Sequence, residues 1–260
     1  MNHPSNYDHY DYKSSFWGNG KRAYEHGVES RLIQNLLSRH GVKGAHIGDI
    51  GCGFGRLFPS YEPFAQSVTL LDYSHDMLAQ ARASIQTKKP IQFVQGNALS
   101  IPLPDAELDA CISIRTLHHL EEYDVFLSEL CRVTKPGGLV IFEIPNYRHI
   151  KNIVLYALGR AENPFQHRIH QLGNRFVNFH PDLIYRTLER VGLQRIETVN
   201  GSFFRSEWVK RTVPTPWLIR LDQVAQRCLS WTDLTPSIYC VCRPMVPVGD
   251  RKPSLAFQPS

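Results

Sequence analysis

Residues 46–56, His-Ile-Gly-Asp-Ile-Gly-Cys-Gly-Phe-Gly-Arg, run from a short apolar strand into a turn that is rich in glycine. Gly51, Gly53 and Gly55 have no Cβ, so the backbone can turn sharply here and approach a ligand closely. A helix that follows such a turn directs its free N–H groups at the same ligand. This arrangement is typical of a nucleotide-binding loop.

The spacing of the glycines distinguishes between two kinds of nucleotide. A dinucleotide motif has the order G-x-G-x-x-G, whereas here the third glycine comes one place early and Arg56 stands in the position of the last glycine. Asp49, two residues before Gly51, is also unfavourable beside a pyrophosphate. Its carboxylate would suit a ligand that carries an ammonium group, and an NAD-linked oxidoreductase is therefore a distant alternative.

A second carboxylate closes the next apolar segment, 68–72, and comes 21 positions after Gly51. Asp72 is suited to accept hydrogen bonds from both hydroxyls of a ribose. Further strands are predicted at 91–94, 108–114 and 139–144. They are accompanied by the segments Gly96-Asn-Ala98, Leu117-His-His-Leu120 and Lys135-Pro-Gly-Gly138.

With these segments the chain resembles the class I S-adenosylmethionine-dependent methyltransferases, in particular small-molecule enzymes of the type 11 kind, with their D-x-G-x-G-x-G, D-x-S, L-H-H-L and K-P-G-G motifs. The resemblance covers about residues 46–144 and, more loosely, the elements after 180. It implies an α/β, Rossmann-like fold with a seven-stranded, mostly parallel sheet. The implied strand order is 3-2-1-4-5-7-6, with strand 7 antiparallel, helices on both faces and helical insertions as a lid.

The resemblance also implies S-adenosylmethionine as the cofactor, with S-adenosylhomocysteine as the product. The glycine turn would hold the methionine end, with Asp49 near its amino group and Asp72 on the ribose. Asn97 departs from the family, which usually has an aspartate there to accept from the adenine amino group, and a neutral acceptor weakens that bond by about 1 kcal/mol. The other positions that the resemblance assigns to the cofactor are Cys52, Tyr73, Met77, Ala98, Leu99 and Arg115.

Methyl transfer from a sulfonium is an in-line displacement, so the protein mainly has to orient the acceptor and exclude water. A hydroxyl acceptor would also need a base. His118 and His119 follow the fourth strand directly and are candidates because a histidine pKa near 6.5 suits proton removal. Alternatively, one or both serve the cofactor or packing. His180 and Tyr147 are further candidates from the predicted lid, and no metal is expected.

The chain divides into a cap segment at 1–26, a methyltransferase domain at 27–243 and a loosely ordered tail at 244–260. Insertions at 145–180 and 203–232 leave from the carboxyl ends of parallel strands, where open α/β sheets bind ligands, and are expected to cover the substrate. Helices are predicted at 27–40, 75–86, 122–132 and 181–191, and the last strands at 194–199 and 237–243. Tyr7, Tyr10, Tyr12 and Trp17 could close over the cofactor or simply pack.

Charge gives a clue to the acceptor. Residues 145–232 hold 13 Lys and Arg against 6 Asp and Glu, whereas the rest of the chain holds 16 against 18. An acidic acceptor would be attracted to such a surface, although exposed insertions can also carry solvated charges. Apolar residues recur at helical spacing near 150–158 and 217–229. We expect these stripes to pack inward, with a lid for a lipid-linked acceptor or contact with an anionic membrane as the alternatives.

The remaining features narrow the class of protein. The chain is 42% hydrophobic, has no apolar run long enough for a membrane span and lacks a secretory segment at residues 1–7, so a cytoplasmic location is expected. Its six cysteines form no C-x-x-C pair and are predicted to pack.

A small-molecule methyltransferase is the first hypothesis. A nucleic-acid methyltransferase is supported by a pI near 8.9 but lacks an N-P-P-Y type segment after strand four. The third hypothesis is a non-catalytic protein that binds S-adenosylmethionine or S-adenosylhomocysteine. The acceptor, the methylated atom and the oligomeric state stay open.

Overall fold

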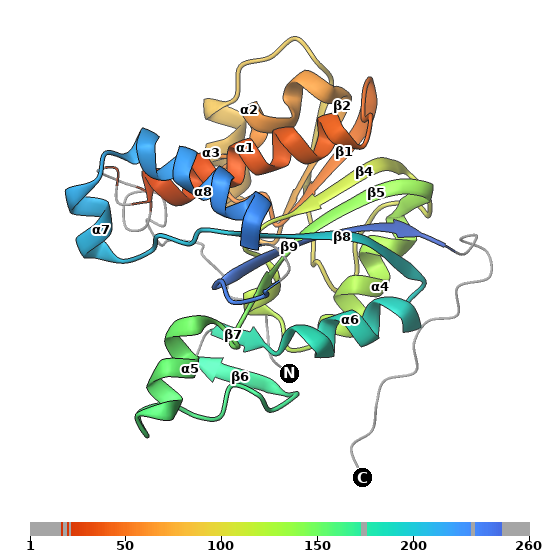
Figure 1. Ribbon diagram of the computed structural model, residues 1–260. Coiled ribbons are helices and arrows are strands. Elements are labelled where there is room, and N and C mark those ends of the chain that lie inside the picture. Colours follow the sequence, from red (N-terminus) through yellow and green to blue (C-terminus); the bar gives the residue numbers. More distant parts are fainter. Residues whose placement is uncertain (1–16, 18–19, 21, 173–175, 230–231, 246–260) are drawn as a thin grey trace.

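The computed structural model describes residues 17, 20, 22–172, 176–229 and 232–245 (Figure 1). The predictions for Tyr7, Tyr10, Tyr12 and most of the 244–260 tail concern residues outside the described ranges. The described chain forms one seven-stranded sheet with helices on both faces and a small two-stranded sheet beside it.

The large sheet has the order β3-β2-β1-β4-β5-β9-β8. Its strands are β1 (Ala45–Ile50), β2 (Ala65–Asp72), β3 (Ile91–Gln95), β4 (Leu108–Ser113), β5 (Thr134–Pro145), β8 (Leu193–Gly201) and β9 (Ser237–Pro244). The first five pair in parallel, and β9 pairs antiparallel with both β5 and β8. Since β9 and β8 are the seventh and sixth strands of this sheet along the chain, the predicted order and the antiparallel strand are confirmed.

Helices cover both faces of the sheet. On one face lie α1 (Ala23–Arg39), α2 (Phe58–Tyr61), α3 (His75–Ser84) and α8 (Thr215–Leu229), and on the other α4 (Tyr123–Val133) and α6 (Pro181–Arg190) (Figure 1). The remaining elements are the short turns η3 (Glu62–Phe64) and η4 (Leu117–His119), the helices α5 (Ile150–Ala157) and α7 (Glu207–Thr212), and the hairpin of β6 (Ile169–Leu172) and β7 (Phe176–Phe179). No helix in the described ranges has the length and apolar character needed to cross a membrane.

The central strands are buried on both faces, which explains their continuous apolar sequence. In β5, Val140 and Phe142 pack into the core beneath α4 and α6, whereas Leu139 and Ile141 pack into the core beneath α1. Cys240 and Cys242 of β9 both point into the first of these cores, with their sulfurs 3.6 Å apart. Five of the six cysteines are buried, as the packing prediction expected, and Cys228 is exposed.

The helices of the two insertions are less buried than the sequence predicted. The apolar stripes of α5 and α8 are largely exposed, so the prediction that they pack inward is wrong. In α8 the reason is that a polar residue forms the buried contact. Asp222 is fully buried and accepts hydrogen bonds from Tyr24 Oη and from the backbone N–H of Phe203, at 2.8 Å for the latter. The side of α8 that packs on α1 is thus held by hydrogen bonds as well as by Leu218.

Candidate cofactor and acceptor site

The glycine turn after β1 has the backbone conformation that its sequence indicates. Gly51, Gly53 and Gly55 have φ angles of 77°, 55° and 74°, in the left-handed region that favours glycine. A Cβ on Gly51 would lie 2.2 Å from Thr116 Oγ1, so this position also leaves no space for a side chain. The N–H groups of Gly51 and Cys52 donate to the carbonyl oxygen of Leu71, at 2.8 and 3.0 Å, which fixes the turn against the end of β2.

Two carboxylates flank this turn at the ends of neighbouring parallel strands. Asp49 is buried and accepts a 2.7 Å hydrogen bond from Tyr61 Oη. Burial raises the pKa of Asp49 to about 6. Asp72 accepts from the backbone N–H of Gly53 at 2.7 Å and of Ser74 at 2.9 Å.

A cavity of about 50 Å³ opens at the turn, and Asp49 and Arg115 are among the residues that line it. The described side chains fit S-adenosylmethionine, because a buried carboxylate faces this cavity where an ammonium group would find a counter-charge, and Asp72 lies at the next strand end. When bound, that cofactor would supply a methyl group on a sulfonium centre. Asp49 and the glycine turn would hold the methionine end of the cofactor, and Asp72 would bind its ribose.

The structure brings only some of the predicted cofactor residues to this cavity. Asp49, Gly51, Cys52, Gly53 and Arg115 line it. The others, Gly55, Asp72, Tyr73, Met77, Asn97, Ala98 and Leu99, are not among its lining residues.

Asn97 and Met77 have structural contacts of their own. Asn97 Oδ1 accepts from the backbone N–H of Leu99 at 2.9 Å and closes a local turn after β3. The backbone N–H of Met77 donates to Ser74 Oγ at the start of α3. The assignment of the adenine contacts to these residues stays a prediction.

Glu29 of α1 is a site residue that the sequence reasoning missed. Its fully buried carboxylate accepts from Arg115 Nε at 2.8 Å and pairs with a guanidinium nitrogen of Arg56 at 2.6 Å. The ring of Trp17 lies over both arginines, with its centroid 4.0 Å from Arg56 Cζ and 5.6 Å from Arg115 Cζ. The sequence did hold an indication of this role, because Glu25 and Glu29 fall among the apolar residues that recur at helical spacing in this segment.

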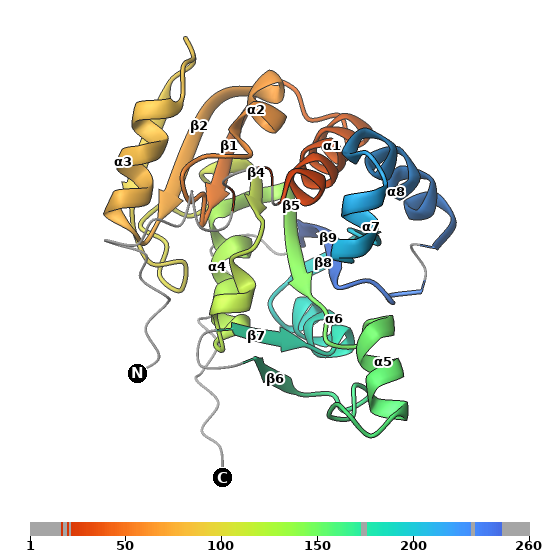
Figure 2. The same ribbon diagram turned by 90° about the vertical axis from the view of Figure 1, so that its left-hand side faces the viewer.

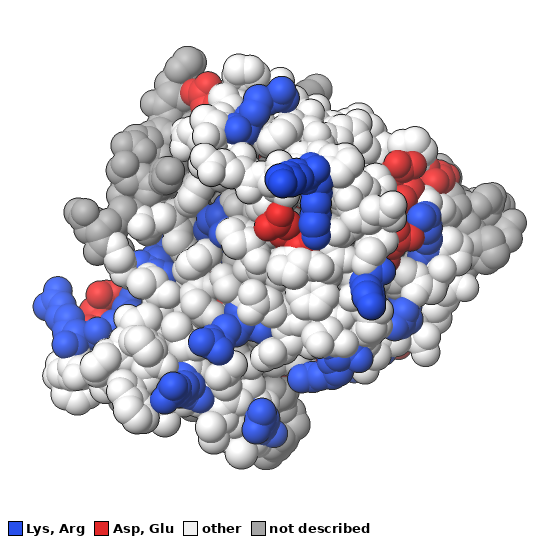
Figure 3. All heavy atoms as spheres, turned by 90° about the horizontal axis from the view of Figure 1, so that it is seen from above, with Lys and Arg blue, Asp and Glu red and all other residues white. Residues whose placement is uncertain are grey.

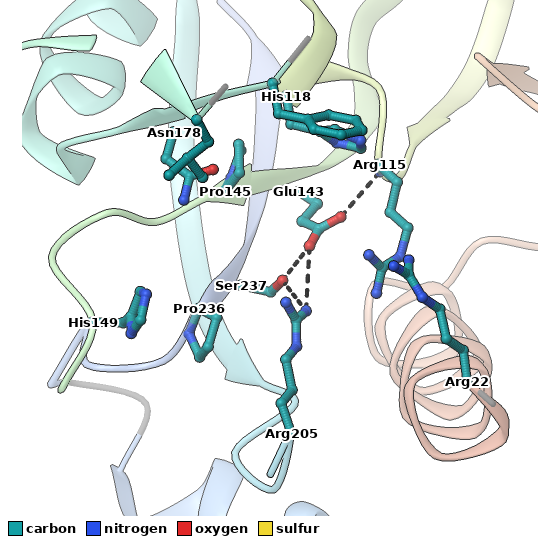
Figure 4. Close-up of a pocket in the computed structure, with 12 residues that line it drawn as sticks. Arg22, Arg115, His118, Glu143, Pro145, His149, Asn178, Arg205, Pro236 and Ser237 are labelled. Atoms are coloured by element: carbon teal, nitrogen blue, oxygen red, sulfur yellow. Dashed lines mark hydrogen bonds and ion pairs between the residues drawn. The ribbon is translucent and has the colours of Figure 1, made fainter. Parts of the chain in front are cut away.

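A second cavity, of about 340 Å³, is also lined by Arg115 (Figure 4). It is lined by residues from η4, β5, β7, β9 and the segments around α1, α5 and α7. They are Arg22, Arg115, His118, Glu143, Pro145, His149, Leu172, Phe176, Asn178, Arg205, Pro236 and Ser237.

Glu143 is the one acidic residue that lines this cavity in the described part of the chain. One of its oxygens accepts from the backbone N–H of Arg115 at 3.0 Å, and the other accepts from Ser237 Oγ. Arg205 donates to Ser237 Oγ at 2.6 Å and lies 3.8 Å from Glu143 (Figure 4). The Nε of Arg205 is buried without a hydrogen-bond partner among the described residues.

The histidines of the cavity are held in the neutral form. Burial, followed by the charges of His119, Arg115, Arg22 and Arg205, lowers the pKa of His118 well below its ordinary value. Burial and Arg205 lower the pKa of His149 to about 4. A neutral imidazole at neutral pH can accept a proton.

The other candidate bases lie elsewhere. The ring of His119 lies against that of His118, with centroids 4.0 Å apart and planes tilted by 42°, and His119 does not line the cavity. His180 is buried at the start of α6, where its Nδ1 accepts from the backbone N–H of Asp182, and it lines neither cavity. Its ring stacks on His167 at 4.2 Å, and these two histidines with Asp182 place possible metal-ligating atoms within 4.8 Å of one another. Tyr147 stacks on His170 at 3.7 Å.

The fold and the site define a class of protein, and the comparisons agree. Residues 48–142 match the methyltransferase domain family. These residues therefore form a class I S-adenosylmethionine-dependent methyltransferase domain of the type 11 kind, whose cofactor is S-adenosylmethionine.

Two relatives are similar over part of the chain. A fatty-acid O-methyltransferase from Mycolicibacterium smegmatis is 28% identical over 65% of this chain and 58% of its own length. A malonyl-[acyl-carrier protein] O-methyltransferase from Serratia marcescens is 34% identical over 46% of this chain and 45% of its own length. The matched segments thus span only about half of either relative.

A solved structure shares the fold over most of both chains. Magnesium protoporphyrin IX methyltransferase from Synechocystis PCC 6803, determined with bound S-adenosylhomocysteine, has a TM-score of 0.57 and 16% identity. The superposition covers 88% of this chain and 86% of that one. At this level of identity the likeness concerns the fold alone.

Proposed function

We propose that this protein transfers the methyl group of S-adenosylmethionine to an acidic small molecule, such as an acyl chain that bears a carboxylate, bound in the cavity beside Arg205. The observation that carries the proposal is that Arg115 lines both cavities. An acceptor in the larger cavity would thus lie next to the cofactor's methionine end, as an in-line displacement requires.

The charge of the larger cavity supports an acidic acceptor. Three arginines line it against one glutamate, and both oxygens of Glu143 are already hydrogen-bonded. Of the three, Arg115 already forms an ion pair with Glu29. Arg205 has an unused Nε donor and only a distant pairing with Glu143, so it is the group best placed to receive an anionic acceptor.

The shape of the cavity supports an acceptor with an apolar part. Leu172 and Phe176 line it from the hairpin of β6 and β7. The names of the two relatives refer to acyl acceptors, a fatty acid in one case and a malonyl group in the other. An acyl chain with an acidic end would use both the apolar and the basic residues of the cavity.

The test begins with calorimetric titration of S-adenosylhomocysteine, with NAD as the control ligand, followed by a methyl-transfer assay on a panel of acids and their neutral amides. We expect binding of S-adenosylhomocysteine alone and turnover of acids in preference to amides. Binding without turnover on any acceptor would favour a non-catalytic, cofactor-binding protein instead.

Arg205→Gln sharpens the test of the acceptor. Loss of a charged hydrogen bond should raise KM for acidic acceptors about 10- to 100-fold and leave the affinity for S-adenosylhomocysteine unchanged. Arg168→Gln is the matched control, because Arg168 lies in the other insertion, is half exposed, pairs with Glu162 and does not line the cavity. Equal KM values for the two variants would contradict the assignment of Arg205.

A further inference from the structure

The first insertion presents an apolar stripe that no described residue covers. Ile150, Val154 and Leu158 follow one another at intervals of four residues along α5 and its C-terminal end, and they are 54%, 49% and 61% exposed. No residue of α5 is buried. Such a stripe is unfavourable in water unless another apolar phase meets it.

The second insertion repeats this pattern on the outer side of α8. Trp217, Leu221 and Val224 lie on one face of the helix and are exposed, whereas Leu218 and Asp222 hold the opposite face against α1. Trp208 of α7, close by in the chain, is 73% exposed. Exposed tryptophans beside leucine and valine are typical of helices that lie in a membrane interface.

Basic side chains flank both stripes. Lys151 and Arg160 lie beside the stripe of α5, and Arg220 and Arg227 beside that of α8, all of them exposed. Within the described residues, Lys151, Arg160 and Arg227 take part in no ion pair, so their charges are not neutralised by the protein itself. Over the two insertions the sequence has 10 Lys and Arg against 3 Asp and Glu.

The two helices lie on the same side of the molecule. In Figure 2, α5 and α8 both occupy the right-hand side, one below the other, with α7 next to them. Figure 3, seen from above, shows Lys and Arg side chains spread across the surface with few Asp or Glu side chains near the lower edge. A flat, negatively charged partner on this side of the molecule could therefore reach both helices at once.

We propose that the exposed faces of α5 and α8 dock this protein on an anionic lipid surface. The apolar stripes would enter the interface to the depth of the acyl chains, and the flanking lysine and arginines would bind lipid phosphates. A second copy of the chain is the other occupant to consider. It would bring two positively charged faces together, and this repulsion favours the lipid surface.

The inference extends the proposed function, because His149 at the start of α5 and Arg205 just before α7 line the acceptor cavity. Docking would hold that cavity near a store of acyl chains. Docking involves no methyl-transfer step, so vesicle binding can be measured without a methyl donor or acceptor.

The experiment is co-sedimentation of the full chain with vesicles of phosphatidylcholine, alone or mixed with phosphatidylglycerol. We expect sedimentation only with the mixed vesicles, and less of it as salt screens the charges. Val154→Asp with Leu158→Asp, and Leu221→Asp with Val224→Asp, should each reduce binding at least tenfold, since each double variant removes two apolar side chains from the interface. Lys151→Glu should weaken binding about fivefold or more.

Ile196→Asp is the matched control, because Ile196 is similarly exposed but lies on β8, outside both insertions. It should bind vesicles as the unaltered protein does. An unchanged affinity for S-adenosylhomocysteine and an unchanged circular dichroism spectrum would show that each variant is folded.

Three results would overturn the proposal. They are no sedimentation with either vesicle, equal sedimentation with neutral vesicles, and an equal loss of binding in Ile196→Asp. Light scattering provides a further check. A dimer that the same aspartate variants dissociate would identify a second copy as the occupant of this surface and would also overturn the proposal.

Discussion

Arg115 Nε donates a hydrogen bond to Oε1 of Glu29 across 2.8 Å, and this bond joins the first helix to the loop after β4. The same loop residue has a φ of 62° and donates its backbone N–H to Glu143. The position of Arg115 between the two cavities is thus fixed from α1 on one side and from β5 on the other.

Glu29→Gln should therefore destabilise the protein. Burial by itself would raise the pKa of Glu29, but the charges of Arg115 and Arg56 lower it by more, and the pKa lies below its ordinary value of 4.5. Breaking a buried ion pair costs about 3 to 5 kcal/mol. We expect a loss of that order in the free energy of urea unfolding at neutral pH.

The direction of the shift in the pKa of Glu29 determines how this loss of stability depends on pH. Because the folded-state pKa is depressed, the stabilisation is complete above about pH 4.5 and disappears as the pH falls through the lower, folded-state value. The difference between the protein and Glu29→Gln should shrink in that range. Glu197→Gln, which removes a more exposed pairing with Arg39 and His40, is the control and should cost no more than about 1 kcal/mol.

Gly51→Ala should abolish or greatly weaken binding of S-adenosylhomocysteine. The new Cβ would meet Thr116 Oγ1 at 2.2 Å and would also oppose a φ of 77°. Gly53→Ala has a positive φ of 55° but no atom within 4 Å of the new Cβ, so it carries the backbone strain alone. Calorimetry on both variants separates the two causes, and equal affinities would show that the clash with Thr116 is relieved by movement of the loop.

Asp72→Ala should lower the affinity for S-adenosylhomocysteine by losing the predicted ribose contacts and the hydrogen bond that fixes Gly53. Removal of a charged acceptor corresponds to about 1.5 to 3 kcal/mol for one hydrogen bond, or roughly 10- to 100-fold in Kd. Asp76→Ala, at the first turn of α3 and outside both cavities, is the control. An unchanged dissociation constant for Asp72→Ala would remove its assigned role.

His118→Ala and His119→Ala, made separately, distinguish a base from a packing residue. If His118 removes a proton, its loss should lower kcat by about 10²- to 10⁴-fold and change cofactor binding little. Since the pKa of His118 is lowered well below 6.5, the rate should not fall as the pH drops from 8 to 6. Equal activity of both variants would end the proposal of a histidine base.

The sequence predicted the sheet well because its central strands are buried on both faces. Runs such as Leu139 to Ile144 favour buried strands, and the glycine turn required left-handed backbone that the structure shows. The hairpin of β6 and β7 was missed, because its four-residue strands contain His170 and Gln171 and show no regular alternation. The contact of Glu29 with Arg115 was missed because it joins residues 86 positions apart.

The outer face of α8 was misjudged for a related reason. Hydrophobic periodicity assumes that apolar side chains form the buried side of a helix. In α8 the buried side depends on Asp222, whose partners lie on α1 and after β8, and sequence alone cannot locate such partners.

The distribution of the cysteines has a consequence for thiol chemistry. Burial raises the pKa of Cys52, Cys111 and Cys242 above the ordinary value, so these sulfurs are both shielded and protonated. Thiolates are the species that react with maleimides and oxidants. Alkylation of the native fold is therefore directed to Cys228, one helical turn beyond Val224 on α8.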